Sequence, residues 1–164
     1  MIEKYGDLFD TTATYLAQGV NVKGVMGAGI AKQFKSYFPN MFDEYKRSCD
    51  NGELEPGGFQ AVPLSRIIVV NLASQEKPGA DARYHWLFES LMRFAQIASK
   101  PHLLEAYGGT IAIPEIGCGI GGLEWHRVKY MLECIEKMYP GIEFEVWHYA
   151  PKEKSEEATS TSSR

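Results

Sequence analysis

The chain has 164 residues, 45% of them hydrophobic, which is enough to bury the core of one domain. It carries 17 Lys and Arg against 21 Asp and Glu, a formal charge of −4, and shows no dense basic run. Because affinity for a phosphate backbone comes from clustered Lys and Arg, this argues against strong binding to duplex nucleic acid. The three cysteines form no CxxC pair and the four histidines show no ligand spacing, so we expect no disulfide framework, no metal and no cofactor.

The two ends of the chain carry little apolar sequence. The N-terminus lacks the apolar core of a signal peptide, and no window approaches the roughly 20 apolar residues of a membrane span. Residues 151–164 contain one alanine and no larger apolar side chain, too little to offset the entropy of ordering them. We therefore expect a soluble, cytoplasmic monomer with one domain at residues 1–150 and a disordered polar tail at residues 151–164.

The first half of the chain mixes strand and helix patterns. Short strands are predicted at residues 1–5 and 14–20. A helix is predicted from Ala28 to the residue before Pro39, followed by a second, short helix through Phe42 and Tyr45. A proline makes residues 59–63 an edge strand, and the continuous apolar run at residues 67–73 predicts a central strand with both faces covered.

The second half of the chain continues this alternation. A polar loop at residues 74–83 leads into an amphipathic helix at residues 84–99. A strand at residues 111–113 leads into a glycine loop and another amphipathic helix, and residues 143–149 alternate as a final strand. The order of elements predicts an α/β fold.

Two glycine loops are the strongest functional signal. One is Gly24-Val25-Met26-Gly27-Ala28-Gly29-Ile30-Ala31, and the other runs from Pro114 through Gly117, Gly119, Gly121 and Gly122. Each follows a strand and opens a helix. Glycines let backbone N–H groups turn toward a ligand, and the start of a helix adds unpaired donors and a positive dipole end. A lone glycine loop could be a simple turn, but two of them suggest a diphosphate held from both sides.

Neither loop fits a better-known nucleotide motif. Gly117, Gly119 and Gly122 match GxGxxG, but the dinucleotide fingerprint belongs to the first strand–helix unit, and here only one strand follows. No GxxxxGK[ST] pattern occurs, so a P-loop is also excluded. The ligand implied has phosphates but needs no ATP chemistry.

Two polar residues near these loops have two interpretations each. Asp7 follows a strand and a glycine, where it could accept a hydrogen bond from an exocyclic amine or a ribose hydroxyl, or cap a turn. Asn21 lies at the mouth of the first loop, where it could orient a ribose or tie down the loop backbone. Residue type alone does not decide between them.

Three segments together resemble the macrodomain, an ADP-ribose-binding module. They are Gly6-Asp7-Leu8-Phe9, Asn21 with residues 24–31, and Pro114-Glu115-Ile116-Gly117-Cys118-Gly119-Ile120-Gly121-Gly122-Leu123-Glu124-Trp125. The residues of the two glycine loops are most similar to those of the subgroup that contains the terminal ADP-ribose glycohydrolases and the DarG antitoxins. The resemblance covers about residues 1–150 and implies a three-layer α/β/α sandwich on a mixed sheet of about six strands.

The resemblance also implies a ligand site. Adenine would lie near Asp7, Leu8 and Tyr149. Asn21 and residues 27–31 would line the distal ribose and one side of the diphosphate, and residues 117–121 would wrap the other side with backbone N–H groups. The implied contact residues are Asp7, Leu8, Asn21, Met26, Gly27, Gly29, Ile30, Ala31, Gly117, Cys118, Gly119, Ile120, Gly121 and Tyr149.

The chain departs from this subgroup at its catalytic positions. The subgroup's lysine, in the loop after the central strand, falls on Gln75, which has no amine nucleophile, and an aspartate of its second loop falls on Gly121. Cys118 has no base visible in the sequence that would activate it. We therefore predict binding of ADP-ribose, free or on an ADP-ribosylated macromolecule.

The alternative is an ADP-ribosyl hydrolase. It would act on protein or nucleic acid, or on a derivative such as the 1''-phosphate or O-acyl form, with Gln75, Lys77 or Asp81 as the catalytic group.

Overall fold

The computed structural model describes residues 1–150, and the predicted tail at residues 151–164 lies outside the described residues. The strands are β1 (Ile2–Tyr5), β2 (Tyr15–Val20), β3 (Phe59–Pro63), β4 (Ile68–Ala73), β5 (Thr110–Ile113) and β6 (Glu143–His148). The helices are a 3₁₀ turn η1 (Leu8–Asp10), α1 (Gly29–Tyr37), α2 (Pro39–Asp50), α3 (Tyr84–Ala98), α4 (Pro101–Tyr107) and α5 (Trp125–Met138).

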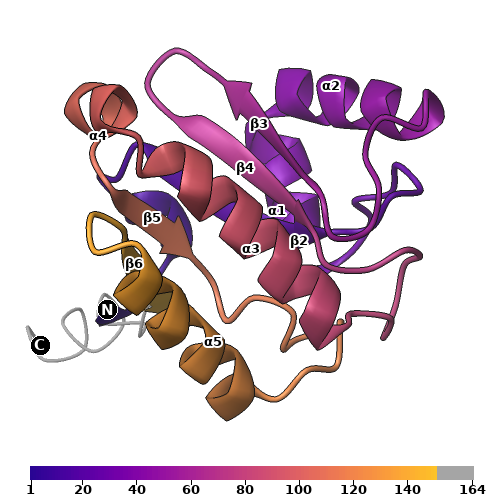
Figure 1. The fold of residues 1–164 in the computed structure, drawn as a ribbon. Helices are drawn as coiled ribbons and strands as arrows, with labels where there is room; N and C mark the ends of the chain where they lie inside the picture. The colour runs from indigo at the N-terminus through magenta and orange to yellow at the C-terminus, as the bar shows by residue number, and fades with distance from the viewer. Residues whose placement is uncertain (151–164) are drawn as a thin grey trace, which may run out of the picture.

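The six strands form one mixed sheet in the order β1-β6-β5-β2-β4-β3 (Figure 1). The strands β1, β6, β5, β2 and β4 pair in parallel, and β3 pairs antiparallel with β4 at the edge. The predicted mixed six-stranded sheet is confirmed, and so is the edge position of β3. Because the carboxyl ends of parallel strands meet at one edge, the loops after β2, β4, β5 and β6 are brought together there.

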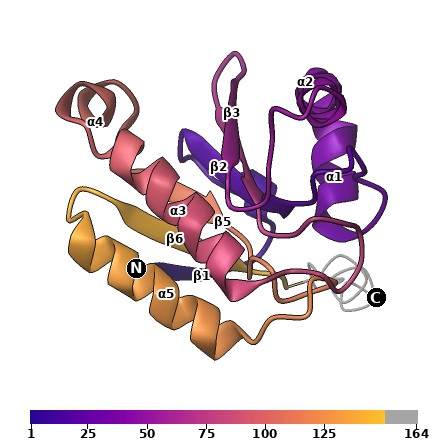
Figure 2. The same ribbon diagram turned by 45° about the vertical axis from the view of Figure 1, so that its right-hand side comes forward.

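Helices cover both faces of the sheet (Figure 2). Side chains alternate along β2, so Tyr15 and Ala17 join the core beneath α3 and α5, whereas Leu16 and Val20 join the core beneath α1 and α2. Residues of β4 divide in the same way between the two cores. The predicted three-layer α/β/α arrangement is therefore confirmed.

Three local predictions need correction. Pro39 begins α2, in which it is the first residue, and at 12 residues α2 is longer than the nine-residue α1 and not a short helix. The strand predicted to be central, β4, lies one position from the edge; β3 and the helices still cover it. The helix α4 was not predicted. It has seven residues, none of them buried, so it has no apolar stripe to detect.

Within residues 1–150, no helix is long and apolar enough to cross a membrane. The same residues contain no group of three or more His, Cys, Asp or Glu side chains placed to hold a metal ion.

Candidate functional site

A cleft of about 740 Å³ opens at the carboxyl edge of the parallel strands. The end of each of β2, β4, β5 and β6 contributes to its wall. Eleven of the residues named from the sequence line it: Asn21, Gly27, Gly29, Ile30, Ala31, Gln75, Gly117, Gly119, Ile120, Gly121 and Tyr149. Six others do not line it: Asp7, Leu8, Met26, Lys77, Asp81 and Cys118.

Asn21 holds the backbone of the first glycine loop (residues 24–31). Its Oδ1 accepts hydrogen bonds from the N–H groups of Lys23 (3.0 Å) and Val25 (3.4 Å), and its Nδ2 donates to the carbonyl of Val25 (2.8 Å). The buried Tyr45 hydroxyl donates to the Asn21 carbonyl at 2.7 Å and lies 2.9 Å from Oδ1. Burial raises the pKa of Tyr45, which keeps the hydroxyl protonated as a donor. Of its two interpretations, Asn21 therefore serves as a loop anchor.

The first glycine loop presents the start of α1 to the cleft. The N-cap residue Ala28 offers no side-chain acceptor. Within residues 1–150, the N–H groups of Gly29, Ile30 and Ala31 have no hydrogen-bond acceptor, and these residues line the cleft. Unpaired N–H groups at a helix start, together with the helix dipole, favour an anion.

The second glycine loop (residues 114–124) supplies a matching set of donors. Its turn is closed by the N–H of Leu123, which donates to the carbonyl of Gly117 at 2.9 Å, and Gly117 has a φ of 76°, a value that favours glycine. The N–H groups of Gly119, Ile120 and Gly121 have no acceptor within residues 1–150. All three residues line the cleft.

The two glycine loops face each other across the cleft. A Cβ atom added at Gly29 would lie 3.1 Å from Cδ1 of Ile120. Six backbone donors, three from each loop, therefore belong to residues that line one cleft. A Cβ at Gly121 would lie 2.7 Å from the carbonyl oxygen of Gly117 and 2.9 Å from Cβ of Ala82, so this backbone has no room for a side chain at residue 121.

The loop between β4 and α3 (residues 74–83) is closed by two of its own side chains. Nε2 of Gln75 donates to the carbonyls of Lys77 (2.7 Å) and Gly79 (3.0 Å). Oδ2 of the buried Asp81 accepts from the N–H groups of Glu76 (3.0 Å) and Lys77 (3.1 Å). These contacts, the hydrogen bond from Lys77 foremost, hold the pKa of Asp81 below its usual value despite burial. Asp81 is thus an ionised loop anchor, and the exposed Lys77 lies outside the cleft wall.

The remaining residues named from the sequence have structural contacts. Oδ1 of Asp7 accepts from the N–H of Phe9 at 3.0 Å and so caps η1, which is the turn-capping alternative. Leu8 and Met26 are buried in the core beneath α1 and α2. Sγ of Cys118 donates to the carbonyl of Ile116 at 3.3 Å, and burial raises the pKa of this thiol to about 11, which disfavours a nucleophilic thiolate.

A charged group at the β6 end of the cleft was not predicted. Nδ1 of His148 lies 2.6 Å from Oε1 of Glu115, and Nε2 lies 2.9 Å from Oε1 of Glu3. Burial lowers the pKa of His148, but the two carboxylates outweigh this effect and raise it. The ring also stacks on Tyr5, with centroids 5.0 Å apart. His148 and Glu115 both line the cleft, where they form an ion pair.

Ala28 lines the cleft within the predicted segment 27–31, and Val25, Pro114 and Ile116 line it within or beside the two glycine loops. The lining residues that the sequence did not indicate are Gly19, Val20, Gln33, Ser74, Pro78, Gly79 and Trp147. Most of them flank the predicted positions at strand ends, so the strand–loop boundaries could have indicated them.

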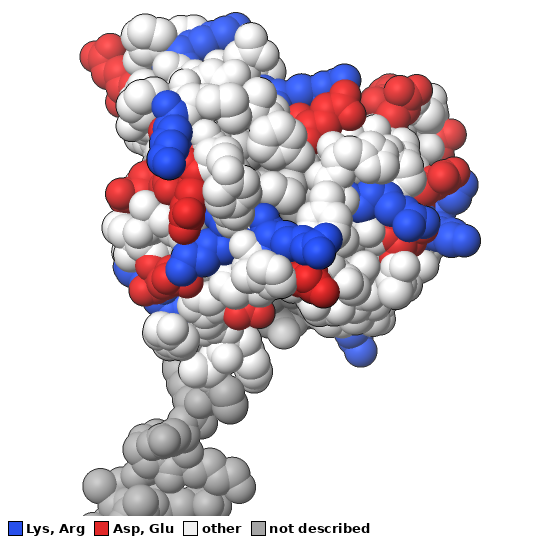
Figure 3. Space-filling model, turned by 60° about the horizontal axis from the view of Figure 1, so that its bottom comes forward, with Lys and Arg blue, Asp and Glu red and all other residues white. Residues whose placement is uncertain are grey.

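On the face of the molecule drawn in Figure 3, basic and acidic side chains are interspersed and form no continuous basic surface.

Known proteins share this architecture. Residues 17–132 match the model of the Macro domain. The chain is 31% identical over 155 residues to a DNA ADP-ribosyl glycohydrolase of Thermus aquaticus, covering 90% of this chain and 40% of that protein. It is 30% identical over 129 residues to the ADP-ribose glycohydrolase OARD1 of Homo sapiens, covering 78% of each.

Solved structures of similar proteins have the same fold. The macrodomain of Mycobacterium tuberculosis DarG superposes with a TM-score of 0.76 at 28% identity, covering 92% of this chain and 99% of that one. Thermosipho africanus DarTG in complex with ADP-ribose, at 23% identity, shares the fold with a TM-score of 0.69 over 93% of this chain and 42% of that one. The chain spans about 40% of the length of the DNA ADP-ribosyl glycohydrolases that it matches. With the family model matching well over half of its length, the chain belongs to the Macro domain family.

Proposed function

We propose that this chain binds ADP-ribose, free or as a terminal modification of a macromolecule, in the cleft between its two glycine loops. The observation that carries the proposal is a set of six backbone N–H groups, in residues 29–31 and 119–121, that have no acceptor among residues 1–150 and belong to residues lining a single cleft. Such donors suit a diphosphate because they need no cationic side chain. The volume of about 740 Å³ is within the range of small-molecule sites.

The order of the strand ends supports one orientation of the ligand. Tyr149 and Trp147 lie at the β6 end of the cleft, where aromatic side chains can pack against adenine. The diphosphate lies between the glycine loops after β2 and β5. The distal ribose then reaches the end after β4, beside Gln75.

Binding without hydrolysis is favoured by what surrounds the distal ribose. Gln75 has no amine to attack the sugar, and Asp81 is occupied with the N–H groups of its own loop. Lys77 is exposed and outside the cleft wall, and the backbone at Gly121 has no room for a carboxylate side chain. The groups that could perform the chemistry are absent from the wall or already hydrogen-bonded.

Calorimetric titration with ADP-ribose tests the proposal. We expect one site with a dissociation constant on the order of 1 μM, equivalent to roughly −8 kcal/mol. A flat titration of the folded protein would overturn this function.

The alternative function is removal of ADP-ribose, and the names of the relatives favour it as a second candidate. The protein would be incubated with ADP-ribosylated DNA, ADP-ribosylated protein and the O-acyl and 1''-phosphate derivatives, and released products would be measured. Binding without turnover on all four supports the binding module. Turnover that Lys77→Ala or Gln75→Ala abolishes, while thermal unfolding is unchanged, would establish the hydrolase instead.

A further inference from the structure

We infer that a second pocket, at the amino ends of β2 and β5, binds a primary ammonium group carried on an alkyl chain, as in a lysine side chain or a free diamine. This pocket lies at the opposite end of the parallel strands from the cleft, and the inference does not depend on the binding of ADP-ribose. Its volume is about 240 Å³, against about 740 Å³ for the cleft. It therefore suits a small group and not a nucleotide.

Glu145 of β6 supplies a carboxylate to this pocket, although its side chain is only 7% exposed. Oε1 accepts hydrogen bonds from the Thr11 hydroxyl and the Trp147 indole N–H, both at 2.6 Å, which fix the orientation of the carboxylate. Oε2 accepts no hydrogen bond within residues 1–150, and it is not among the fully buried atoms that lack a partner, so a ligand can reach it. A carboxylate oxygen with free lone pairs attracts an N–H donor that carries a positive charge.

Lys4 leaves this oxygen available. It approaches Glu145 from β1, on the other side of β6 from β5. Its Nζ lies 3.6 Å from Oε2, which is too far for a hydrogen bond, and its side chain is 43% exposed. Such a partly exposed ion pair is weak, so it does not replace a donor bound in the pocket.

Hydroxyl groups make up much of the remaining lining, and they belong to Thr12, Thr14, Tyr107 and Thr110. Within residues 1–150 these hydroxyls form no hydrogen bond, unlike that of the neighbouring Thr11. A primary ammonium has three N–H donors and no acceptor, so one carboxylate oxygen and two hydroxyl oxygens can satisfy it. The ring of Tyr107 adds an aromatic face for the cation or its alkyl chain.

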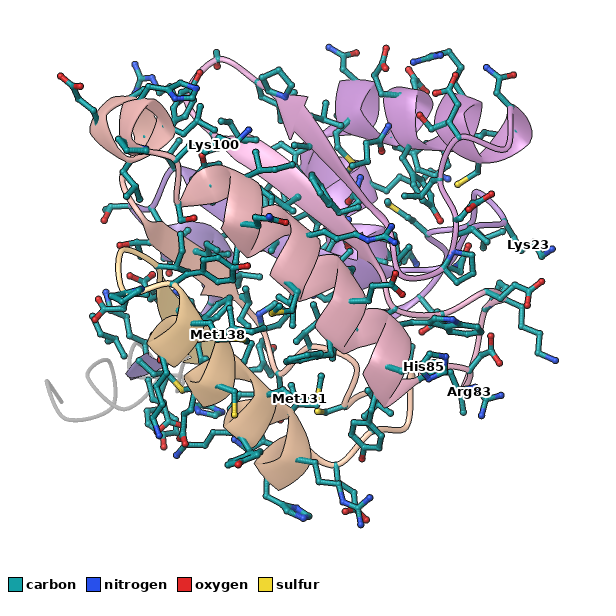
Figure 4. The ribbon with its side chains drawn as sticks, viewed as in Figure 1. Lys23, Arg83, His85, Lys100, Met131 and Met138 are labelled. Atoms are coloured by element: carbon teal, nitrogen blue, oxygen red, sulfur yellow. The ribbon has the colours of Figure 1, made fainter. Side chains whose placement is uncertain are left out.

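The sequence around the pocket is acidic. Within two positions of the lining residues there are four carboxylates and no Lys or Arg, in residues 10–16, 105–112 and 143–147. The cations labelled in Figure 4 lie elsewhere: Lys23 and Arg83 extend from loops at the carboxyl edge of the sheet, and the exposed Lys100, between α3 and α4, is outside the lining. The local charge thus favours a cation over an anion or a neutral ligand.

NMR titration of the folded, isotope-labelled protein with n-butylammonium chloride tests this inference. We expect saturable shifts of the amide signals of Thr14, Gly108 and Thr110, with a dissociation constant on the order of 1–10 mM. The controls are n-butanol, which has the same carbon chain without the charge, and potassium chloride, which has the charge without N–H donors. Neither should give saturable shifts at these residues.

Two further ligands distinguish the sources of the ammonium group. Nα-acetyl-lysine methylamide represents the side chain of a peptide, and diaminopentane represents a free diamine. Tighter binding of the first identifies a protein partner, and tighter binding of the second identifies a small amine. The inference is wrong if butylammonium and both of these leave the pocket signals unshifted.

Variants locate the binding. Glu145→Gln keeps an oxygen for Thr11 and Trp147 but removes the charge, and it should weaken butylammonium binding at least about 10-fold. Thr110→Val removes a hydroxyl but keeps the β-branched shape, and it should weaken binding at least about threefold. Glu143→Gln, at the exposed start of β6 and outside the pocket, makes the same change as Glu145→Gln and should leave the affinity unaltered.

Other results would overturn the inference. It fails if n-butanol or potassium chloride reproduces the shifts, because the pocket would then not recognise a charged N–H donor. It also fails if Glu145→Gln and Thr110→Val both bind butylammonium like the wild type while their thermal unfolding is unchanged. Should Glu145→Gln not fold, Thr110→Val decides alone. Titration with ADP-ribose reports on the cleft, so its outcome decides the proposed function separately.

Discussion

The glycine loops and the β4–α3 loop border the same cleft but offer it opposite chemistry. Beside the first glycine loop, Asn21 and Tyr45 hold the backbone by hydrogen bonds, and the N–H groups of residues 29–31 and 119–121 have no acceptor among residues 1–150. In the β4–α3 loop, Gln75 and Asp81 turn inward and bond the loop's own carbonyls and N–H groups. The glycine loops thus expose backbone donors, whereas the β4–α3 loop uses two of its side chains to bond its own backbone. This contrast agrees with the proposed binding of a diphosphate between the glycine loops.

The largest expected effect comes from placing a charge among the free donors. Gly119→Glu has room, because a Cβ there meets no atom within 4 Å, but its carboxylate would compete with the diphosphate. We expect affinity for ADP-ribose to fall at least about 100-fold, or roughly 2.7 kcal/mol, in calorimetry. Gly119→Gln, similar in size and uncharged, should lose far less. Equal losses in both variants would mean that bulk and not charge closes the cleft.

The next largest effect tests whether the first glycine loop needs the hydrogen bond from Tyr45 to Asn21 in order to bind the ligand. Tyr45→Phe removes the buried hydroxyl that donates to the Asn21 carbonyl, and leaves that acceptor unsatisfied. We expect the free energy of unfolding to fall by about 1–2 kcal/mol in chemical denaturation, and ADP-ribose affinity to fall with it. Tyr130→Phe, on the exposed face of α5, is the control and should change neither. A stable Tyr45→Phe protein with full affinity would contradict the role of this anchor.

Asp81 in the β4–α3 loop predicts that the stability of the folded protein depends on pH. The pKa of Asp81 is lowered in the folded state, so its contribution to stability is present above the unfolded-state value near 3.8 and is lost as pH falls through the lower folded-state value. Asp81→Asn should therefore lower the melting temperature by a few degrees at pH 7, and the difference from wild type should vanish in acid. Asp10→Asn controls for the loss of an exposed carboxylate. A difference that persists unchanged in acid would show that charge is not what Asp81 contributes.

The smallest expected effect is on stability at the β6 end of the cleft, where His148 pairs with both Glu3 and Glu115. The folded-state pKa of His148 is raised, so its stabilising effect is present in full below about 6.5 and is lost as pH rises through the folded-state value. We expect His148→Gln to melt below wild type at about pH 6, with a gap that narrows by about pH 8.5. His102→Gln, on the exposed face of α4, should show no such narrowing. A gap that widens with pH would contradict the assigned direction.

The fold was largely predictable because its signals are local. Apolar runs and amphipathic stripes predicted all six strands and four of the five α-helices, since each pattern reflects burial on a known period. The helix α4 was not predicted because its two turns contain no buried residue and so show no apolar periodicity. The edge position of β3 followed from its proline, whereas the strand order did not follow from any residue.

The candidate site was predictable only in part. The glycine loops could be found because two of them occur at strand-to-helix junctions, and eleven of the named residues line the cleft. The sequence did not reveal that Asp7, Cys118 and Asp81 bond backbone groups nearby and do not line the cleft, because residue type shows which bonds a side chain can form and not which partner is near. His148 was missed for the same reason.

The sequence by itself determined that two glycine-rich turns follow apolar strands, and that the polar loop after β4 carries an amide side chain, Gln75, near its start. Both are properties of single positions and their neighbours in the chain. Only the tertiary structure decided which donors remain free and which side chains are already engaged. It brings Glu3 against His148 across 145 positions, and Gly29 against Ile120 across the cleft. Such contacts depend on the parallel packing of strands far apart in sequence, which no local pattern encodes.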